Sequence, residues 1–379
     1  MKEKIKLLTV IETLGKGGAE RVLVNTLPEL KKLGIECEVV ILFERDDLAE
    51  ELEAYGIKVH RLNLSYKWNV IEGIFKLNRL MRDNDYDILH AHLFFAYFYA
   101  GLVKLLHTKI KTVTTFHNLG YDTYPANTLM KKLRKKMDAL VINKLIDKKV
   151  AVSHAVREHY SQHLNIDHVD LIFNSFPLDV MDATLHMGRT EVLKKYADVA
   201  LFDTFSITPG RLVKEKGHGT LLEAMESVNK QGMKFCHFIV GSGPLEEEIN
   251  RGIEEKKLLN VILIPGLVQN ELFELIKACD FTVIPSISEG FGMVVGEVMA
   301  LGSPLVATKV DGILEMVTDE KEGLLVPPED SHALAEGIER LYKDKALRNS
   351  LAMNAKEKIK QFDIKIIAKQ WKAYYEGMI

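Results

Sequence analysis

The chain has 379 residues, of which 47% are hydrophobic and 27% charged. This composition is that of a globular protein, and the length exceeds one typical domain and suits two. Cys37, Cys236 and Cys279 form no CxxC pair, which argues against a disulfide framework or a cysteine zinc site and favours a reducing compartment. No run of about 18 uncharged apolar residues is present, so we expect no membrane-spanning helix.

The net charge of −3 is unevenly distributed along the chain. Residues 1–175 contain 26 basic and 22 acidic residues, whereas residues 176–379 contain 24 and 31. The first half is therefore suited to contact with an anionic partner, unless the difference in charge arises by chance. Aromatic residues do not alternate with the basic ones, so nucleic acid is not an expected partner.

Short apolar runs alternate with amphipathic helical patterns along the whole chain. The first series contains "IKLLTVI", a helix over 19–33, "CEVVILF", "KVHRL", a helix over 70–82, "DILHAH", a helix over 96–106 and "KTVTTFH". The second series, from about residue 200, contains "LFDTFSITPG", "FCHFIVGSG", "VILIPG", "FTVIPS" and "PLVAT". Such alternation predicts an α/β protein with parallel sheets covered on both faces.

The segment around Pro177 breaks this rhythm and marks the predicted domain boundary. We expect two doubly wound domains, over residues 1–175 and 176–360. Residues 341–379 have a helical pattern, and the helix over about 360–379 is expected to pack back on the first domain. Ligands are expected at the carboxyl ends of the strands.

The stretch "ISEGFGMVVGEVMA" places two carboxylates in an apolar surrounding. Glu289 is predicted in a strand-to-helix loop, the helix begins near Gly292, and Glu297 lies about one and a half turns into it. The free amides of the first turn suit a phosphate, while the glutamates suit sugar and ribose hydroxyls. The alternative is a glutamate favoured by the helix dipole, with a second one incidental.

Two further loops carry groups suited to a diphosphate. In "LGKGGAERV" the glycines allow close approach of the backbone to a phosphate, although plain turn glycines are the alternative. The loop lacks the G-x-G-x-x-G pattern of dinucleotide sites. In "RLVKEK", Arg211 and Lys216 can neutralise a leaving diphosphate, unless they are ordinary surface cations. No D-x-D suited to a metal ends a strand, so we expect no metal site.

Taken in order, several motifs resemble one family over essentially the whole chain. The Glu289 and Glu297 spacing resembles the E-x7-E motif of retaining glycosyltransferases of the GT-B fold, family 4 type. "GKGGAERV", "DILHAHL", "TTFHN", "AVSHAV", "GRLVKEKG", "VGSGPLEEEI" and "PGLV" match that family in order. The resemblance implies two Rossmann-like domains that face each other across a deep cleft.

The resemblance also assigns roles to individual residues. His117 would face the transferred sugar, Arg211 and Lys216 the leaving diphosphate, and Glu289 the sugar hydroxyls. His90 and His92 are weaker candidates, for support or acceptor contact. Asn174-Ser175 replaces the Asn-Gly usual in the family, so no ligand role is assigned to that loop. The implied donor-binding residues are Gly17, Gly18, Val268, Gly290, Phe291, Gly292, Met293, Val294 and Glu297.

The implied activity is metal-independent, retaining transfer of a hexosyl or N-acetylhexosaminyl group. The donor would be a nucleotide-diphosphate sugar, with no cofactor, and the acceptor a lipid-linked or glycan molecule of bacterial-type surface polysaccharide synthesis. The expected location is the cytoplasm, peripheral on the inner face of the membrane. The alternatives are a GT-B nucleotide-sugar epimerase, a dehydrogenase, which the failed fingerprint disfavours, and a non-catalytic nucleotide-sugar-binding protein.

A basic amphipathic helix is predicted over residues 127–149. Leu129, Leu133, Met137 and Leu145 recur at helical spacing beside a cluster of cations. Such a helix is suited to an anionic membrane surface, and the alternative is a solvated face of a core helix. The cluster consists of Lys131, Lys132, Arg134, Lys135 and Lys136.

Overall fold

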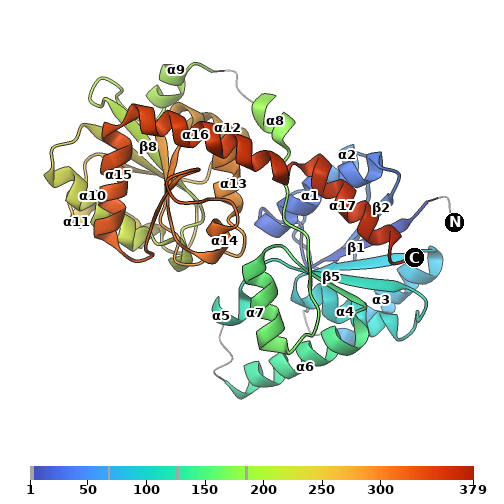
Figure 1. Cartoon of the computed structure of the whole chain (residues 1–379). Helices are drawn as coiled ribbons and strands as arrows, with labels where there is room; N and C mark the ends of the chain where they lie inside the picture. The colour runs from blue at the N-terminus through green and yellow to red at the C-terminus, as the bar shows by residue number, and fades with distance from the viewer. Residues whose placement is uncertain (1–3, 67–68, 124–127, 184–186) are drawn as a thin grey trace. The chain divides into compact units, whose positions relative to one another are not determined.

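The computed structural model describes residues 4–66, 69–123, 128–183 and 187–379, and the chain divides into two compact units (Figure 1). Unit 1 comprises Met1–Phe176 and Phe362–Ile379, and unit 2 comprises Pro177–Gln361. The division falls one residue after the boundary predicted between 175 and 176. The chain returns to unit 1 at residue 362, close to the start of the predicted terminal helix.

Unit 1 is built on a parallel sheet of seven strands in the order β3-β2-β1-β4-β5-β6-β7. The order reverses between β1 and β4, whose neighbouring strands run in register from Leu7 opposite Ile88 to Ile11 opposite His92. In sequence order the strands are β1 Lys6–Ile11, β2 Glu36–Ile41, β3 Lys58–Arg61, β4 Ile88–His92, β5 Lys111–Phe116, β6 Lys148–Ala151 and β7 Asp170–Leu171. The helices are α1 Gly18–Lys32, α2 Ala49–Ala54, α3 Val70–Asp83, α4 Phe94–Lys104, α5 Gly120–Thr123, α6 Leu129–Leu145, α7 His154–Leu164 and α17 Ile364–Glu376.

Unit 2 repeats this topology with six parallel strands in the order β10-β9-β8-β11-β12-β13. The order reverses between β8 and β11. The strands are β8 Thr204–Pro209, β9 Phe235–Val240, β10 Val261–Ile264, β11 Phe281–Ile284, β12 Leu305–Thr308 and β13 Leu324–Val326. The helices are α8 Leu178–Ala183, α9 Arg189–Lys194, α10 His218–Lys230, α11 Glu246–Glu255, α12 Gln269–Ala278, α13 Met293–Ala300, α14 Asp311–Leu314, α15 Ser331–Lys343 and α16 Lys345–Ile359, with short 3-10 turns η1 Lys214–Lys216 and η2 Lys360–Phe362.

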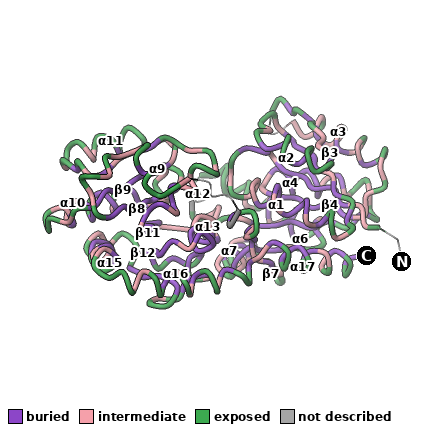
Figure 2. The backbone as a smooth tube through the Cα atoms, turned by 90° about the horizontal axis from the view of Figure 1, so that it is seen from above, coloured by how far each residue is buried: buried purple, intermediate pink, exposed green. Residues whose placement is uncertain are grey.

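The central strands of both sheets are buried on both faces (Figure 2). All six residues of β8 and of β9 are buried, and so are all five of β4. This explains why they appear in the sequence as continuous apolar runs rather than as alternating patterns. The two predicted parallel-sheet α/β domains are therefore confirmed.

The last helix, α17, packs on α1 within unit 1 (Figure 1). Trp371 is buried and stacks on Tyr375, with ring centroids 5.4 Å apart. The Tyr374 hydroxyl donates to Asp170 over 2.6 Å. The predicted helix over 341–379 is instead interrupted, because the backbone of Phe176 bonds to Phe362 and Ile364. Asp363 then caps α17 by accepting from the Lys365 amide.

The basic helix is shorter than its predicted range of 127–149. Residue 127 lies outside the described residues, and α6 ends at Leu145. Ile146 has an extended backbone, and Lys148 and Lys149 start strand β6, which pairs with β5. The last two lysines of the predicted helix are therefore strand residues. Across the described parts of the chain, no helix combines the length and the apolarity that a membrane span requires.

Candidate active site

In unit 2 the loops after β8 and β11 lie in contact where the strand order reverses. Gly217 has a φ of 67°, and a Cβ there would lie 1.9 Å from the Pro285 carbonyl oxygen, so only glycine fits. The Ile287 amide donates to the Glu215 carbonyl over 2.8 Å. The "RLVKEK" and "ISEGFG" loops are therefore held against each other by backbone contacts.

This contact brings together two of the predicted site residues. The Lys216 ammonium forms an ion pair with Glu289 Oε1, which also accepts from Ser286 Oγ over 2.8 Å. The side chains of Lys216 and Glu289 are 17% and 11% exposed. Thr308 at the end of β12 donates to the Ser286 carbonyl and fixes this loop from the other side. The cation is therefore held in one place with little water around it.

The Glu289 loop leads directly into α13. Gly292 adopts the left-handed conformation, with a φ of 76°, and α13 begins at Met293. The first amides of this helix have no partner within the helix, which makes its start suitable for an anion. Phe291 is buried, and Gly312 packs so closely that a Cβ would lie 2.5 Å from the Glu289 carbonyl oxygen. Val294 and Glu297 are partly buried within α13.

Arg211 and Val268 lie on loops of the same unit. The Arg211 guanidinium is exposed and has no hydrogen-bond or ion-pair partner in the part of the chain that the structure describes. Its carbonyl accepts from His218 Nε2 over 3.1 Å. Val268 precedes α12 and is 61% exposed, while its carbonyl accepts from the Leu272 amide over 3.0 Å.

In unit 1 the predicted glycine loop follows β1 and opens α1. Gly17 precedes the helix with an extended backbone, and Gly18 is its first residue. A Cβ on Gly17 would lie 2.3 Å from Glu20 Oε2, so a larger residue there would displace the Glu20 carboxylate. Burial raises the pKa of Glu20, whereas hydrogen bonds from its own backbone and from Thr13 act to lower it.

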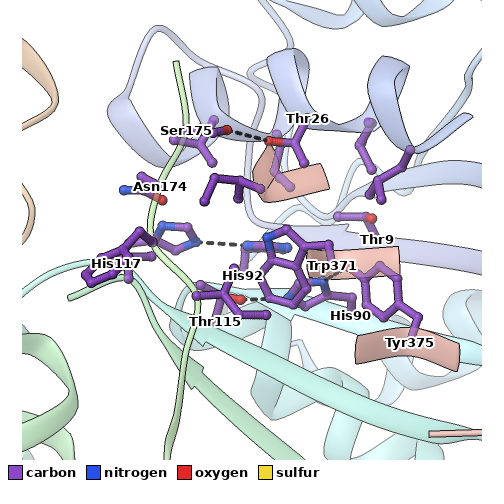
Figure 3. A pocket seen from close by; sticks show the side chains of 18 residues that line it. Thr9, Thr26, His90, His92, Thr115, His117, Asn174, Ser175, Trp371 and Tyr375 are labelled. Atoms are coloured by element: carbon purple, nitrogen blue, oxygen red, sulfur yellow. Dashed lines mark hydrogen bonds between the residues drawn. The ribbon is translucent and has the colours of Figure 1, made fainter. Parts of the chain in front are cut away.

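His117 follows β5 and is joined to a second histidine (Figure 3). Its Nε2 lies 2.8 Å from Nδ1 of His92, the last residue of β4. Burial lowers the pKa of His117 to about 4 and that of His92 well below its usual value, so both rings are neutral at pH 7. The sequence marks His92 only by alternation, because its contact with His117 depends on the register of β4 and β5.

His90 lies on the same face of β4 as His92, as alternation predicts, with ring centroids 4.0 Å apart. It belongs to a separate set of hydrogen bonds. Its Nδ1 lies 2.7 Å from the Tyr375 hydroxyl on α17, and its Nε2 lies 2.7 Å from Thr115 Oγ1. His90 thus ties the terminal helix to the sheet.

One group with metal-ligating side chains occurs among the described residues: Asp122, His159 and His163. His159 Nε2 accepts from the Tyr121 amide over 3.1 Å, so its Nδ1 carries the proton that faces Asp122. The Lys135 ammonium donates to His163 Nδ1 over 2.9 Å, which leaves the proton of that ring on Nε2, also facing Asp122. Neither histidine presents a lone pair to the centre of the group, so we assign no metal to it.

Two residues of the unit 2 site were not predicted. Ser286 positions Glu289 through a hydrogen bond to its side chain, and Gly312 through close packing against its backbone. Gly312 lies within "KVDGILEMV", and a glycine just after a strand end was the signal available for it. Nothing in the sequence marks Ser286 as a site residue, because serines are common in loops and have many roles there.

Two family models match the chain, and together they cover most of it. Residues 16–180 match Glycosyltransferase Family 4, and residues 198–358 match Glycosyl transferases group 1. The first model covers most of the unit 1 strands and the glycine loop. The second contains Lys216, Glu289 and Glu297.

Individual relatives extend over the full length. An N-acetylgalactosamine-N,N'-diacetylbacillosaminyl-diphospho-undecaprenol 4-alpha-N-acetylgalactosaminyltransferase of Campylobacter jejuni is 27% identical over 98% of this chain and 100% of its own length. The putative teichuronic acid biosynthesis glycosyltransferase TuaC of Bacillus subtilis is 25% identical over 88% of both chains.

Solved structures show the same fold. Anabaena Alr3699/HepE in complex with UDP superposes with a TM-score of 0.82 at 20% identity, over 98% of this chain and 100% of that one. The sucrose-phosphate synthase of Thermosynechococcus elongatus superposes with a TM-score of 0.79 at 20% identity, over 98% and 99% of the two chains. With both family models, full-length relatives and this fold in agreement, the chain belongs to the family 4 type of GT-B glycosyltransferases.

Proposed function

We propose that this glycosyltransferase is retaining and metal-independent. It would transfer a hexosyl or N-acetylhexosaminyl group from a nucleotide-diphosphate sugar to a lipid-linked or glycan acceptor in the synthesis of a surface polysaccharide. The names of the relatives support this class of substrate: the Campylobacter protein acts on a diphospho-undecaprenol acceptor, and the Anabaena structures hold UDP, or UDP-glucose. A nucleotide-sugar epimerase or a non-catalytic binding protein finds no such support.

The observation that carries the proposal is the Lys216–Glu289 pair beside the start of α13. A leaving diphosphate gains negative charge in the transition state, and fixed cations and amides that meet this charge supply most of the catalysis. Lys216 is held by Glu289 before any ligand arrives, and Arg211 has a guanidinium without a partner in the described chain. Two cations and the helix amides would take the place of a metal ion. The adjoining residues Gly290, Phe291, Gly292, Met293 and Val294 would form the rest of the phosphate and sugar loop.

The other parts of the donor have proposed partners of their own. Glu297 would accept from the ribose hydroxyls, and the base would rest on the backbone at Val268. In unit 1, Gly17 and Gly18 would contact the diphosphate, and His117 the transferred sugar.

The same pair bears on the route of retention. Double displacement needs a carboxylate free to attack the anomeric carbon. Oε1 of Glu289 already accepts from Lys216 and Ser286, which makes this carboxylate a poor nucleophile and a good anchor. We therefore favour departure of the diphosphate from the face that the acceptor attacks. The bond from the anomeric carbon to the phosphate oxygen breaks, the acceptor oxygen bonds to that carbon, and the acceptor proton passes to the phosphate.

A donor screen followed by product analysis tests this proposal. The nucleotide sugar that raises the melting temperature most would be used, because binding to the folded state alone stabilises by about 2.7 kcal/mol at a hundredfold excess over Kd. With a lipid-diphosphate saccharide acceptor, NMR of the product should show the anomeric configuration of the donor. Inversion would refute retention, and release of a free epimerised sugar would favour the epimerase.

Metal independence needs a separate measurement on the same reaction. Turnover should persist after exhaustive treatment with EDTA. Loss of turnover that magnesium or manganese restores would contradict it.

The surface of α6 suggests how a lipid-linked acceptor could be reached. Leu129, Met130 and Leu133 are 82%, 75% and 52% exposed, although they are large and apolar. Instead, Asp138, Val141 and Ile142 are the buried residues of this helix. An exposed apolar edge beside exposed lysines suits the headgroup region of an anionic bilayer. We therefore propose that the enzyme works from the cytoplasm, peripheral on the inner face of the membrane.

A further inference from the structure

The two histidines and the neighbouring Thr9 carry buried polar atoms that lack partners. His92 Nε2, His117 Nδ1 and Thr9 Oγ1 are buried and have no hydrogen-bond partner among the described residues. A buried polar atom without a partner is destabilising, and such atoms are rare in folded proteins. Three such atoms around the rings of His92 and His117 therefore indicate that a small polar molecule binds at this site or passes through it.

The three residues that carry these atoms are among those that line one small cavity (Figure 3). Its volume is about 20 Å³, and its lining includes Thr9, His92 and His117 together with Trp371 of α17. One buried water needs about 10–15 Å³ and two to four polar partners. The cavity thus suits a single water beside His92 Nε2, whereas His117 Nδ1, on the other ring, is left without a partner among the described residues.

The tautomers of His92 and His117 depend on each other. Both are neutral, so the short contact between His92 Nδ1 and His117 Nε2 holds one proton, carried by one of these atoms and accepted by the other. If His92 donates, His117 must carry its own proton on Nδ1. If His117 donates, its Nδ1 is a bare acceptor. The partner of His92 therefore decides what His117 can offer to a ligand.

We propose that His92 is a positioning residue, which fixes both the ring and the proton of His117 through this bond and whose other nitrogen is satisfied by one water in the cavity beside Thr9. The inference rests on the proposed function, in which His117 faces the reacting sugar. A ring turned by the loss of this bond would lower turnover, because misplacement of about 1 Å can cost about 10²-fold.

Two substitutions at position 92 separate this role from packing. In asparagine the amide occupies the place of Nδ1 and can donate or accept, so His92→Asn keeps the bond to His117. His92→Leu fills the space better but removes the bond. We expect roughly a 10- to 100-fold loss of kcat for His92→Leu and less than about a threefold loss for His92→Asn, with the donor KM unchanged. Stability should follow the reverse order, since asparagine leaves a larger void.

His90→Leu is the matched control. His90 has the same strand, face and burial, but its bonds go to Tyr375 and Thr115. We expect this variant to lose stability and to keep kcat within about twofold at a temperature where it remains folded. If kcat followed stability across all three variants, with asparagine no better than leucine, the histidines would be structural and the inference would be wrong.

An NMR measurement tests the bond without using activity. With ¹⁵N-labelled histidine, the wild-type protein should show a coupling between His92 Nδ1 and His117 Nε2 across the hydrogen bond, and His117 in a single tautomer. Absence of the coupling, or a His117 signal unchanged in His92→Leu, would overturn the proposal. A His117 that exchanges between tautomers in His92→Leu with full activity would support the positioning and refute the catalytic role of His117.

Discussion

Both units place polar groups beyond the carboxyl ends of a parallel sheet, but they keep these groups in different charge states. In unit 2 Lys216 and Glu289 pair, so each supports the charge of the other at low exposure. In unit 1 His90, His92 and His117 lie together, no carboxylate of the described residues is bonded to them, and burial lowers their pKa values.

This difference indicates a division of tasks. An ion pair that is already formed before the ligand binds suits a unit that contacts a diphosphate, because the cation needs no reorganisation when charge develops. Neutral imidazoles suit a unit that contacts hydroxyl groups, which donate and accept without a net charge. The ion pair, the neutral histidines and the charge difference between the units can each be tested by substitution.

The largest expected effect is on the cations of unit 2. Lys216→Ala and Arg211→Ala should each lower kcat by roughly 10²-fold or more, since removal of one donor to transition-state charge typically costs that much. Steady-state kinetics with the chosen donor would measure it. Lys214→Ala, an exposed lysine in the same short turn, is the matched control and should change kcat little.

Lys216→Ala also leaves Glu289 without its cation, which complicates the result. The double variant Lys216→Met with Glu289→Gln removes both charges and should recover most of the lost stability, because a neutral pair has no uncompensated charge. Its activity should stay low. A double variant with near-normal kcat would show that the pair is structural.

The ion pair also shows where prediction from the sequence reached its limit. Lys216 and Glu289 were both predicted from their motifs, but their contact joins residues 73 positions apart and depends on β8 lying beside β11. The same holds for His92 and His117: alternation places His90 and His92 on one face, whereas only the register of His92 opposite Thr115 brings His117 within reach.

Element types were predicted where the pattern was long. The buried strands β1, β4, β5, β8 and β11 are continuous apolar runs, and α3 differs from its predicted range by one residue. The two residues of β7 and the helices α8 and α9 carry too little periodicity to be recognised. The bounds of α6 failed because basic residues continue from the helix into β6.

Acid is expected to destabilise unit 1, because its buried histidines are neutral in the folded state. Burial lowers the pKa of His117 to about 4 and that of His90 to about 3, against an unfolded value near 6.5. Between these values the unfolded chain binds more protons, so stability falls as the pH drops from 6.5 towards 4. For His117 alone the full shift corresponds to about 3 kcal/mol.

Tryptophan fluorescence can follow this effect, because Trp371 is buried in α17 of unit 1 and residues 177–361 of unit 2 contain no tryptophan. Urea unfolding followed by fluorescence should shift to lower urea between pH 6.5 and 4.5. Unit 2 also buries two histidines, His218 and His237, and burial lowers the pKa of both, that of His237 to about 3, so unit 2 should lose stability in acid as well. In His90→Leu the pH slope of unit 1 should decrease. An unchanged slope would mean that these rings are not the source.

The smallest expected effect concerns the charge difference between the units, and it lies on α6. Not all five cations of the cluster are available to a membrane. The Arg134 guanidinium lies 3.7 Å from the centre of the Phe94 ring, and Lys135 donates to His163. Lys132 and Lys136 are exposed, without an ion-pair partner in the described chain. Substitution of all five would therefore disturb unit 1 as well as its surface charge.

The variant to use is the double change Lys132→Gln and Lys136→Gln. Each cation near an anionic bilayer contributes about 1 kcal/mol, so the pair should lower binding to phosphatidylserine vesicles roughly 30-fold at low salt. The loss should shrink at high salt, where exposed charges are screened. Lys194→Gln with Lys345→Gln removes the same charge from exposed positions of unit 2 and should leave co-sedimentation unchanged. If the wild-type protein stays in the supernatant with these vesicles at low salt, α6 is a solvated face, and an acceptor free in solution becomes the better hypothesis.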